Sequence, residues 1–323
     1  MSNPLVTISL VAFNQAAFIR EAIESCLMQK TQFDYKIIIH DDASTDSTAE
    51  IILEYADKYP EIIRPIIQTE NQFSKGTEIN AKITIPQAKG KYIAFLEADD
   101  YWIDPNKLQF QVDFMESHPE VSMCFTATKT VDASNPEEFS IRRYRNSDSA
   151  VTTENVILIG GHLLDMGSAV VKKSVFNEVP DWYYYSQMWD NTVPLLSTLH
   201  GEIHYLNKVT SAYRVNTPGS YMQKNVKVLE KRKSHILKTL KLLEGFNQAT
   251  NNKYERLIIR KTRLISVGVL LLMDRENTLF KKYYAQLTPL LKLEYKIFNF
   301  IGRYGLWKKY RQLLSMFRKI KYV

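Results

Sequence analysis

The sequence predicts an α/β protein: one Rossmann-like domain with a mostly parallel sheet over residues 1–223, followed by a basic helical region over residues 224–323. Short apolar runs typical of buried strands alternate with segments of helical periodicity, which is the pattern of βαβ units. One of these runs, Tyr92 to Leu96, leads directly into three carboxylates. The charge also divides the chain. Residues 1–223 hold 18 Lys and Arg against 29 Asp and Glu, a net charge of −11, and residues 224–323 hold 24 against 6, a net charge of +18.

The first strands and helices follow from local patterns. Apolar runs rich in β-branched residues predict strands over residues 5–11, 35–40, 62–68 and 92–96. Asn14 has a side-chain oxygen that can cap the first helix, which extends to Gln29. The second helix follows capping residues at 44–46 and runs to Tyr59. Its predicted inward positions are Ala49, Ile52, Leu53 and Ala56.

Beyond residue 104 the pattern continues with less regularity. Apolar stripes predict helices over residues 105–117 and 190–199. The predicted strands in this part are residues 121–126, 167–171 and 205–214. Residues 132–155 are polar and predict a mobile loop, whereas the chain from about residue 226 onward has a helical pattern.

Glu97, Asp99 and Asp100 lie directly after the fourth predicted strand. Ligands of α/β sheets bind beyond the carboxyl ends of the strands. Carboxylates gathered there raise one another's pKa unless a cation lies between them. Carboxylate oxygens together with a substrate phosphate are the usual ligands of Mg²⁺ or Mn²⁺. The motif therefore predicts a divalent cation site, and the alternative is a solvated turn whose acids cap the next helix.

The cysteines, the N-terminus and the longest apolar run indicate the cellular compartment of the protein. Cys26 and Cys124 lie in apolar surroundings without the spacing of a metal site or a disulfide framework, which predicts buried thiols in a reducing compartment. The N-terminus shows no basic segment followed by an apolar one, so no secretory signal is expected. The longest apolar run, residues 264–273, has about half the length that a bilayer crossing needs. We therefore expect a cytoplasmic protein.

Five stretches occur in the order that characterises one enzyme family. They are residues 6–14, 37–46, 70–76, 88–102 and 104–108. On these stretches the chain resembles the family 2 glycosyltransferases, which are inverting sugar-nucleotide enzymes with a single GT-A domain. The resemblance implies transfer of a sugar from a nucleoside-diphosphate sugar to a hydroxyl of a saccharide or lipid-linked acceptor. Such a reaction suits the synthesis of a bacterial surface polysaccharide.

The resemblance also assigns residues to the donor site. Asp42 is expected to meet the nucleotide base, and the alternative for Asp42 is a helix-capping acid. Ala12, Phe13 and Asn14 are expected beside the base or the ribose. Lys75 is expected either to reach the diphosphate or to lie in solvent.

Glu97-Ala98-Asp99 corresponds to the family's Asp-x-Asp metal motif. Glu97 is one methylene longer than the family's first acid, so Asp99 and Asp100 are expected to be the main ligands of Mg²⁺ or Mn²⁺. Asp99 is expected to face both the metal and the donor diphosphate. The cation would act as a Lewis acid that neutralises the leaving diphosphate.

The resemblance places the catalytic base at the start of a helix, where Asp190 stands. Inversion requires a base on the face of the sugar opposite the diphosphate, within reach of the acceptor hydroxyl. The alternative is that Asp190 only caps the helix. Arg214 is expected either to contact phosphate or to form a structural ion pair. Asn216 stands where the family often has a histidine, and an amide is a poor metal ligand in its place.

The basic region mixes Lys and Arg with large apolar residues over about residues 295–322. This composition suits an anionic membrane surface, and the enzyme would then be peripheral on the inner face of the cell membrane. The alternative is a helical cap packed on the catalytic domain. Nucleic acid is not an expected partner, because no binding module accompanies the charge. Two other functions stay open: a degenerate sugar-nucleotide or membrane-surface binding protein without activity, and a sugar-nucleotide nucleotidyltransferase.

Overall fold

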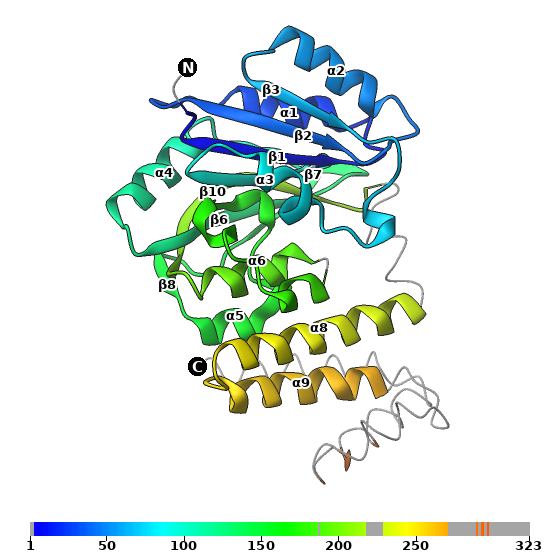
Figure 1. Ribbon diagram of the computed structural model, residues 1–323, viewed down its shortest axis with the longest axis vertical. Helices are drawn as coiled ribbons and strands as arrows, with labels where there is room; N and C mark the ends of the chain where they lie inside the picture. The colour runs from blue at the N-terminus through cyan, green and yellow to red at the C-terminus, as the bar shows by residue number, and fades with distance from the viewer. Residues whose placement is uncertain are drawn as a thin grey trace. The chain divides into compact units, whose positions relative to one another are not determined.

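The computed structural model describes residues 3–186, 188–217 and 229–270, together with Pro289, Lys292, Leu293 and Lys296. The chain forms two compact units, residues 1–227 and residues 228–323. Figure 1 shows a twisted sheet with helices packed on it in the first unit, and a pair of helices in the described part of the second.

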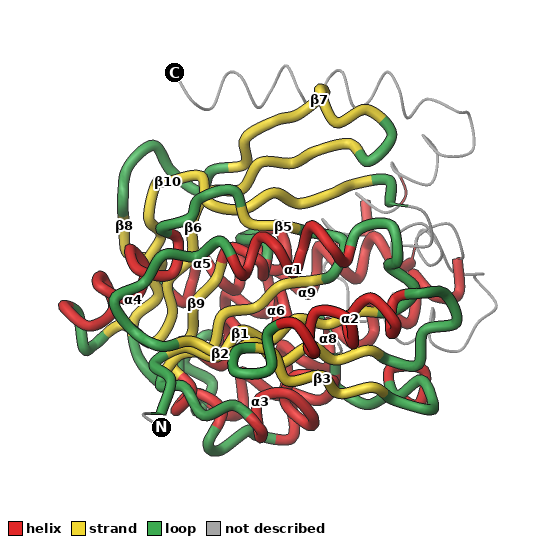
Figure 2. The backbone as a smooth tube through the Cα atoms, turned by 90° about the horizontal axis from the view of Figure 1, so that it is seen from above, coloured by secondary structure: helices red, strands yellow, loops and turns green. Residues whose placement is uncertain are grey.

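The elements of the first unit alternate along the chain, and Figure 2 shows their path. The strands are β1 (Val6–Ala12), β2 (Tyr35–Asp41), β3 (Ile63–Ile67), β4 (Tyr92–Glu97), β5 (Tyr101–Trp102), β6 (Val121–Asp132), β7 (Asn135–Arg142), β8 (Ser149–Val151), β9 (Ala169–Lys172) and β10 (Glu202–Val215). The α-helices are α1 (Ile19–Leu27), α2 (Thr48–Lys58), α3 (Ile85–Gln87), α4 (Lys107–Ser117), α5 (Thr153–Ile159) and α6 (Trp189–Ser197). Shorter helical turns are η1 (Phe73–Lys75), η2 (Asn80–Thr84), η3 (Gly160–His162), η4 (Met166–Ser168), η5 (Lys173–Phe176) and η6 (Asp181–Tyr185).

The ten strands of the described residues form one sheet in the order β3-β2-β1-β4-β9-β6-β10-β5, with β7 paired to β6 and β8 paired to β10. The pairs β3-β2, β2-β1 and β1-β4 are parallel. Ala12 lies opposite Asp41, and Val11 lies opposite Glu97. The ends of β1, β2 and β4 therefore meet at one edge of the sheet. We call it the carboxyl edge, and it is the edge where α/β sheets bind ligands.

The α/β class is confirmed, and the expected parallel pairing holds for the first four strands and for β6 with β10, whereas the other pairs beyond β4 are antiparallel. β9 runs antiparallel to β4 and to β6, whereas β10 runs parallel to β6. Val170 pairs with Ala94 and Lys172 pairs with Tyr92, so β9 runs away from the carboxyl edge. The segment that precedes β9 is brought to that edge as a result.

The prediction of a mobile loop over residues 132–155 is wrong. This stretch contains β7, β8 and the start of α5. β7 pairs antiparallel with β6 while most of its side chains are exposed, including Phe139 at 55%. Edge strands of this kind are held by backbone hydrogen bonds, so their polar composition gives little sign of a strand.

The helices of the first unit bury one face against the sheet, as their periodicity predicts. α1 buries Ile19, Ala22, Ile23 and Cys26, and α4 buries Leu108, Val112 and Met115. Full burial of one such side chain stabilises the fold by roughly 1.5–3 kcal/mol. Leu53 of α2 was predicted to face inward and is 44% exposed, because the inward row of α2 is Ile51, Ile52, Tyr55 and Ala56. Both cysteines are buried and unpaired, as predicted.

A fully buried lysine anchors the segment before β9. Lys107 in α4 has no exposed surface, donates from Nζ to Gln111 Oε1 at 2.7 Å, and lies 4.5 Å from the Trp102 ring centroid. Gln111 Nε2 in turn donates to the Ser168 carbonyl, and Trp102 Nε1 donates to the Gly167 carbonyl. Burial lowers the pKa of Lys107 to about 7.

We expect Lys107→Met to remove a pH dependence of stability. The pKa of Lys107 is lower in the folded chain than in the unfolded one, so unfolding takes up a proton between pH 7 and about 10, and the wild-type free energy of unfolding rises across that window. The total rise is up to about 5 kcal/mol. Urea denaturation at several pH values measures it, with exposed Lys30→Met as the control. Parallel pH profiles for Lys107→Met and wild type would contradict the expectation.

The second unit contains α8 (Leu229–Ala249) and α9 (Glu255–Leu270), which pack against each other in Figure 1. Phe246 and Tyr254 stack at the turn between them, with ring centroids 6.1 Å apart. The basic aromatic segment over residues 295–322 lies outside the described residues, apart from Lys296. Within the part of the chain that is described, no helix has the length and apolar character of a membrane span.

Candidate active site

The acidic turn after β4 is the centre of the candidate site. Ala98 N donates to the Val11 carbonyl and Asp100 N donates to the Glu97 carbonyl, so the turn is fixed on β1 and on itself. Glu97, Asp99 and Asp100 each offer an oxygen, and these atoms lie within 4.8 Å of one another. Of the three side chains, Glu97 is exposed, Asp99 is half-buried and Asp100 is buried.

The electrostatics of this turn favour a bound cation. Although Glu97 keeps solvent contact, desolvation by the surrounding protein raises its pKa to about 8, with Asp99 and Asp190 adding to the shift. Desolvation also raises the pKa of Asp99, and it raises the pKa of Asp100 well above the usual range. A divalent cation would stabilise the ionised carboxylates, and three oxygen donors fit Mg²⁺ or Mn²⁺.

Arg214 fixes the acidic turn from the end of β10. Its Nη1 donates to the Asp99 carbonyl at 2.6 Å, and its backbone N–H donates to Asp100 Oδ1 at 2.8 Å. The guanidinium forms an ion pair with Glu21 and lies 4.3 Å from the centroid of the Tyr101 ring. Of the two expectations for Arg214, the structure therefore supports the structural ion pair.

Asp42, the candidate base-binding residue, ties a loop to the end of β2. Its carboxylate accepts hydrogen bonds from the backbone N–H groups of Gln72 and Phe73, at 2.8 and 3.0 Å. The alternative that Asp42 caps the following helix is wrong, because α2 has Ser47 at its N-cap. The two bonds hold the loop that contains Lys75 against the carboxyl edge.

The other donor-site candidates surround Asp42. Ala12 is buried and its carbonyl accepts from the Asp42 N–H, whereas Phe13 is 39% exposed. Asn14 adopts a φ of 54°, and its Oδ1 accepts from the Thr45 N–H at 2.7 Å. The expectation that Asn14 caps the first helix is therefore wrong, since α1 begins only at Ile19.

Lys75 lies on η1 and is bonded to Glu70 through an ion pair, with about half of its side chain exposed. The ion pair occupies the ammonium group of Lys75. Because the pair is exposed to solvent, it contributes little to the stability of the fold. The lysine is free to exchange Glu70 for a phosphate at little cost. Its contact with a diphosphate stays a prediction.

Asp190 is the second residue of α6, and its neighbour Trp189 packs edge-on against Phe95 of β4, with ring centroids 5.7 Å apart. The N-cap residue is Met188, but the Asp190 carboxylate interacts with the Asn191 N–H in the first turn of α6, so the role of Asp190 as a base stays a prediction beside that of stabilising the helix start. Desolvation raises the pKa of Asp190 to about 6, the Asn191 N–H and Arg142 lower it, and Asp165 raises it. Asp190 in turn raises the pKa of Glu97. The start of α6 therefore lies near the end of β4, and the charges of Asp190 and Glu97 interact.

Sequence reasoning missed two residues of this site. Asp165 is 8% exposed, forms an ion pair with Arg142 of β7, and raises the pKa of Glu97, Asp100 and Asp190. Neither residue follows a strand that the sequence analysis predicted to end at this edge. Only the direction of β9 and the pairing of β7, which appear in the structure, bring them there.

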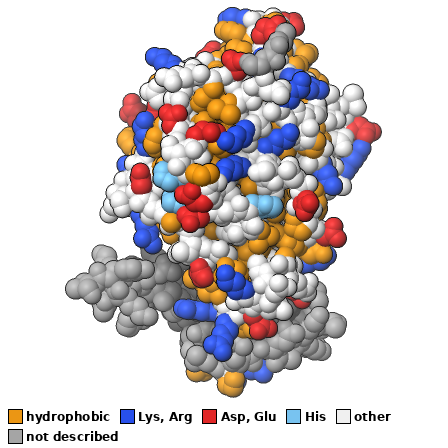
Figure 3. Space-filling view, turned by 60° about the vertical axis from the view of Figure 1, so that its left-hand side comes forward, with side chains coloured by type: hydrophobic (Ala, Val, Ile, Leu, Met, Phe, Trp, Pro, Cys, Tyr) orange, Lys and Arg blue, Asp and Glu red, His pale blue; other side chains and the backbone are white. Residues whose placement is uncertain are grey.

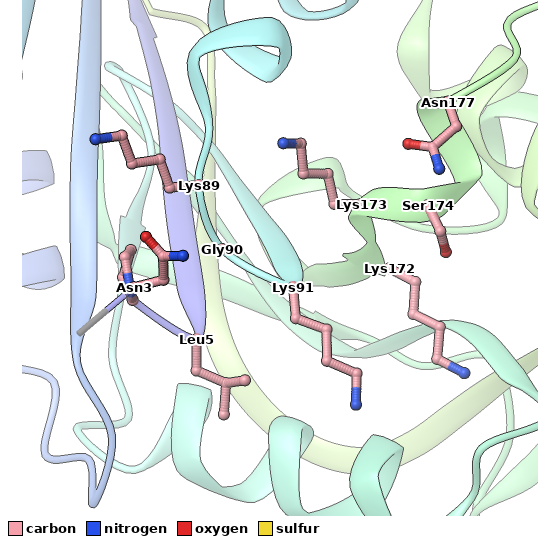
Figure 4. Close-up of a pocket in the computed structure, with 10 residues that line it drawn as sticks. Asn3, Leu5, Lys89, Gly90, Lys91, Lys172, Lys173, Ser174 and Asn177 are labelled. Carbon is pink, nitrogen blue, oxygen red and sulfur yellow. The ribbon is translucent and has the colours of Figure 1, made fainter.

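A pocket of about 590 Å³ lies at the opposite edge of the sheet, at the start of β1 and β4 (Figure 4). Its lining includes four lysines: Lys89, Lys91, Lys172 and Lys173. Three of them already bond within the protein, to Glu116, the Pro119 carbonyl and the Ala88 carbonyl. Figure 4 shows that the four ammonium groups do not converge on one point. This pocket is separate from the acidic site.

Charge is dispersed on one face of the molecule. On the face drawn in Figure 3, acidic and basic side chains alternate with apolar ones, and neither sign forms a continuous area.

A sheet whose parallel strands end in an acidic turn at one edge is the arrangement expected of a GT-A glycosyltransferase domain. The model of the glycosyl transferase family 2 matches residues 7–179, more than half of the chain. The protein belongs to this family. Its relatives include enzymes named as glycosyltransferases of polysaccharide biosynthesis.

Relatives match this chain over part of their own length. An uncharacterised protein of Mycobacterium tuberculosis is 33% identical over 223 residues, which is 66% of this chain and 60% of the relative. The Escherichia coli protein WfaP is named a UDP-Glc:alpha-D-GlcNAc-diphosphoundecaprenol beta-1,3-glucosyltransferase. It is 40% identical over 113 residues, which is 35% of this chain and 42% of that enzyme. The chain thus spans about 40–60% of these relatives.

Solved structures share the fold at low sequence identity. TarS of S. aureus, solved in complex with UDP-GlcNAc, superposes with a TM-score of 0.55 at 15% identity, over 95% of this chain and 91% of that one. The mannosyltransferase PcManGT from Pyrobaculum calidifontis, solved with GDP-Man and Mn²⁺, gives a TM-score of 0.56 at 14% identity, over 98% and 84%. Both confirm the GT-A fold.

Proposed function

We propose that this protein is an inverting, metal-dependent glycosyltransferase. It would move a sugar from a nucleoside-diphosphate sugar to a hydroxyl of a saccharide or lipid-linked acceptor, in the synthesis of a surface polysaccharide. One observation carries the proposal: Trp189, the neighbour of Asp190, packs against Phe95 of β4 with ring centroids 5.7 Å apart, two residues before the acidic turn begins at Glu97. The names of the relatives and the sugar nucleotides bound in the GT-A structures support it.

The donor would bind along the carboxyl edge. Phe13 offers an exposed ring for the base, beside Ala12, Asn14 and the Asp42 turn. Lys75 would leave Glu70 for the diphosphate.

Glu97, Asp99 and Asp100 would hold Mg²⁺ or Mn²⁺. The cation, when bound, supplies positive charge against the leaving diphosphate. Asp100 is buried and accepts the Arg214 N–H, whereas Asp99 is half-buried, so Asp99 is the more accessible of the two carboxylates to the donor. Glu97 has exposed surface and can approach the cation from the solvent side.

Asp190 would serve as the general base. It takes the proton of the acceptor hydroxyl while the acceptor oxygen bonds to the anomeric carbon and the sugar–phosphate bond breaks, so the nucleoside diphosphate leaves and the configuration inverts. A base with a pKa of about 6 is mostly ionised at neutral pH. Its pKa is also close enough to neutral pH for the base to accept a proton effectively.

Residues 1–223 would form the catalytic domain, and the basic region over residues 224–323 would hold the enzyme on an anionic membrane at the cytoplasmic face. The net charge of +18 supports this second role. Sedimentation of the whole chain with vesicles tests it. Equal binding to anionic and neutral vesicles would contradict it.

A panel of UDP-glucose, UDP-N-acetylglucosamine and GDP-mannose tests the activity without a known acceptor. We expect slow release of nucleoside diphosphate from at least one donor with Mn²⁺, and none with EDTA, because water replaces the acceptor. A degenerate binding protein would show a thermal shift with the donor and no release. That outcome would refute the proposed activity.

A further inference from the structure

Gly161 lies directly against the carboxylate of Asp190. Gly161 belongs to η3, the turn that follows α5. A Cβ atom built on Gly161 would stand 2.4 Å from Asp190 Oδ2 and 3.0 Å from Asp190 Cγ. It would also stand 2.9 Å from Asn191 Nδ2. Contacts this short do not occur between real side chains, so any larger residue here must displace Asp190.

The two adjacent positions of this turn require glycine for different physical reasons. Gly160 ends α5 with a φ of 65°, in the left-handed region that favours glycine. Gly161 lies outside that region, so its backbone conformation is open to alanine. Space for the Asp190 carboxylate is therefore the reason for glycine at this position.

Asp190 has little freedom to move away. Trp189, its neighbour in α6, packs edge-on against Phe95 of the sheet, with ring centroids 5.7 Å apart. The ion pair between Asp165 and Arg142 lies close enough to act on the Asp190 charge. Aspartate also has only two side-chain torsions, unlike a long flexible side chain whose tip yields easily.

We infer that Gly161 is a positioning residue: its missing side chain leaves the space that the Asp190 carboxylate occupies. This inference rests on the proposed role of Asp190 as the base. A methyl group at Gly161 would move the carboxylate by a fraction of an ångström to about one ångström. Displacements of that size cost catalysis about 100-fold.

Gly161→Ala is therefore expected to lower kcat about 10- to 100-fold for nucleoside diphosphate release from the active donor. The KM for that donor and the Mn²⁺ dependence should stay within about twofold, because the atoms nearest to a Cβ at Gly161 belong to Asp190 and Asn191 and not to the predicted donor-site residues. The matched control is Gly167→Ala, whose new Cβ would meet Leu96 Cδ1 at an ordinary 3.4 Å. We expect the control to keep wild-type kcat. A kcat of Gly161→Ala within twofold of wild type would overturn the inference.

A double-mutant cycle on stability tests the contact without using activity. Gly161→Ala should lower the melting temperature of the wild type, and it should lower that of Asp190→Ala less, because the carboxylate is gone and only the contact with Asn191 Nδ2 remains. If Gly161→Ala alone does not fold, recovery of folding in the double variant supports the contact. Equal losses in both backgrounds would overturn it. Should the coupling hold while Asp190→Asn keeps full turnover, the placement of the carboxylate stands and the proposed base fails.

Discussion

Asp190→Asn is expected to reduce turnover by about 10²- to 10⁴-fold, the usual contribution of a general base. The amide has nearly the same size as the carboxylate and cannot accept the acceptor proton. Affinity for the nucleoside diphosphate should change less than about threefold, because the base acts only in the transition state. Nucleoside diphosphate release and calorimetric titration measure the two quantities.

Asp181→Asn is the matched control for this experiment. Asp181 is an exposed residue of η6, nine positions earlier, and should keep full turnover after the same chemical change. If Asp190→Asn retains more than a tenth of wild-type turnover, another group accepts the proton.

The proposed role of Asp190 as the base also predicts how kcat depends on pH on the acid side. Desolvation raises the pKa of Asp190 to about 6, so the ionised form is lost as the pH falls through that value. We expect kcat to fall about tenfold per pH unit below pH 6. Circular dichroism at each pH shows whether the chain remains folded over that range. A flat profile down to pH 5 in a folded protein would argue against Asp190.

Asp99→Asn is expected to abolish the part of nucleotide binding that depends on the metal. Loss of a charged ligand facing the diphosphate should weaken affinity for UDP or GDP with Mn²⁺ by roughly 100-fold, equal to about 2.7 kcal/mol. Binding without Mn²⁺ should be unchanged. Calorimetric titration with and without Mn²⁺ measures the difference.

Asp113→Asn provides the control for this second experiment, because Asp113 is an exposed acid of α4. It should bind the nucleotide like the wild type under both conditions. An Asp99→Asn variant with a wild-type response to Mn²⁺ would show that the cation site lies elsewhere.

The first half of the fold could be predicted from sequence for a clear physical reason. Buried parallel strands need continuous apolar runs, and the runs before Asp42 and Glu97 end abruptly in acids. The carboxyl ends of parallel strands share one edge of the sheet. The order of the strands along the chain was therefore enough to predict that these acids lie close together. The α/β class and the family were confirmed on this basis.

The second half could not be predicted in the same way. β7 is an exposed edge strand, and its polar residues carry no apolar pattern. The sequence gives no sign that β9 runs antiparallel, so it could not place Asp165 beside Asp190. The close approach of Gly161 was also hidden, because a glycine pair in a connection is usually taken as a sign of a turn.

The pairing register of the first strands has a consequence for how this chain tolerates insertions and deletions. Side chains alternate between the two faces of a strand, so losing one residue inside β4 would rotate Glu97 to the opposite side while Val11 of β1 stayed in place. Changes of length in the loop between β3 and η1 leave that alternation intact. A change of length between β3 and Gln72 therefore moves no strand side chain to another face, whereas the spacing within β1, β2 and β4 is constrained to the single residue.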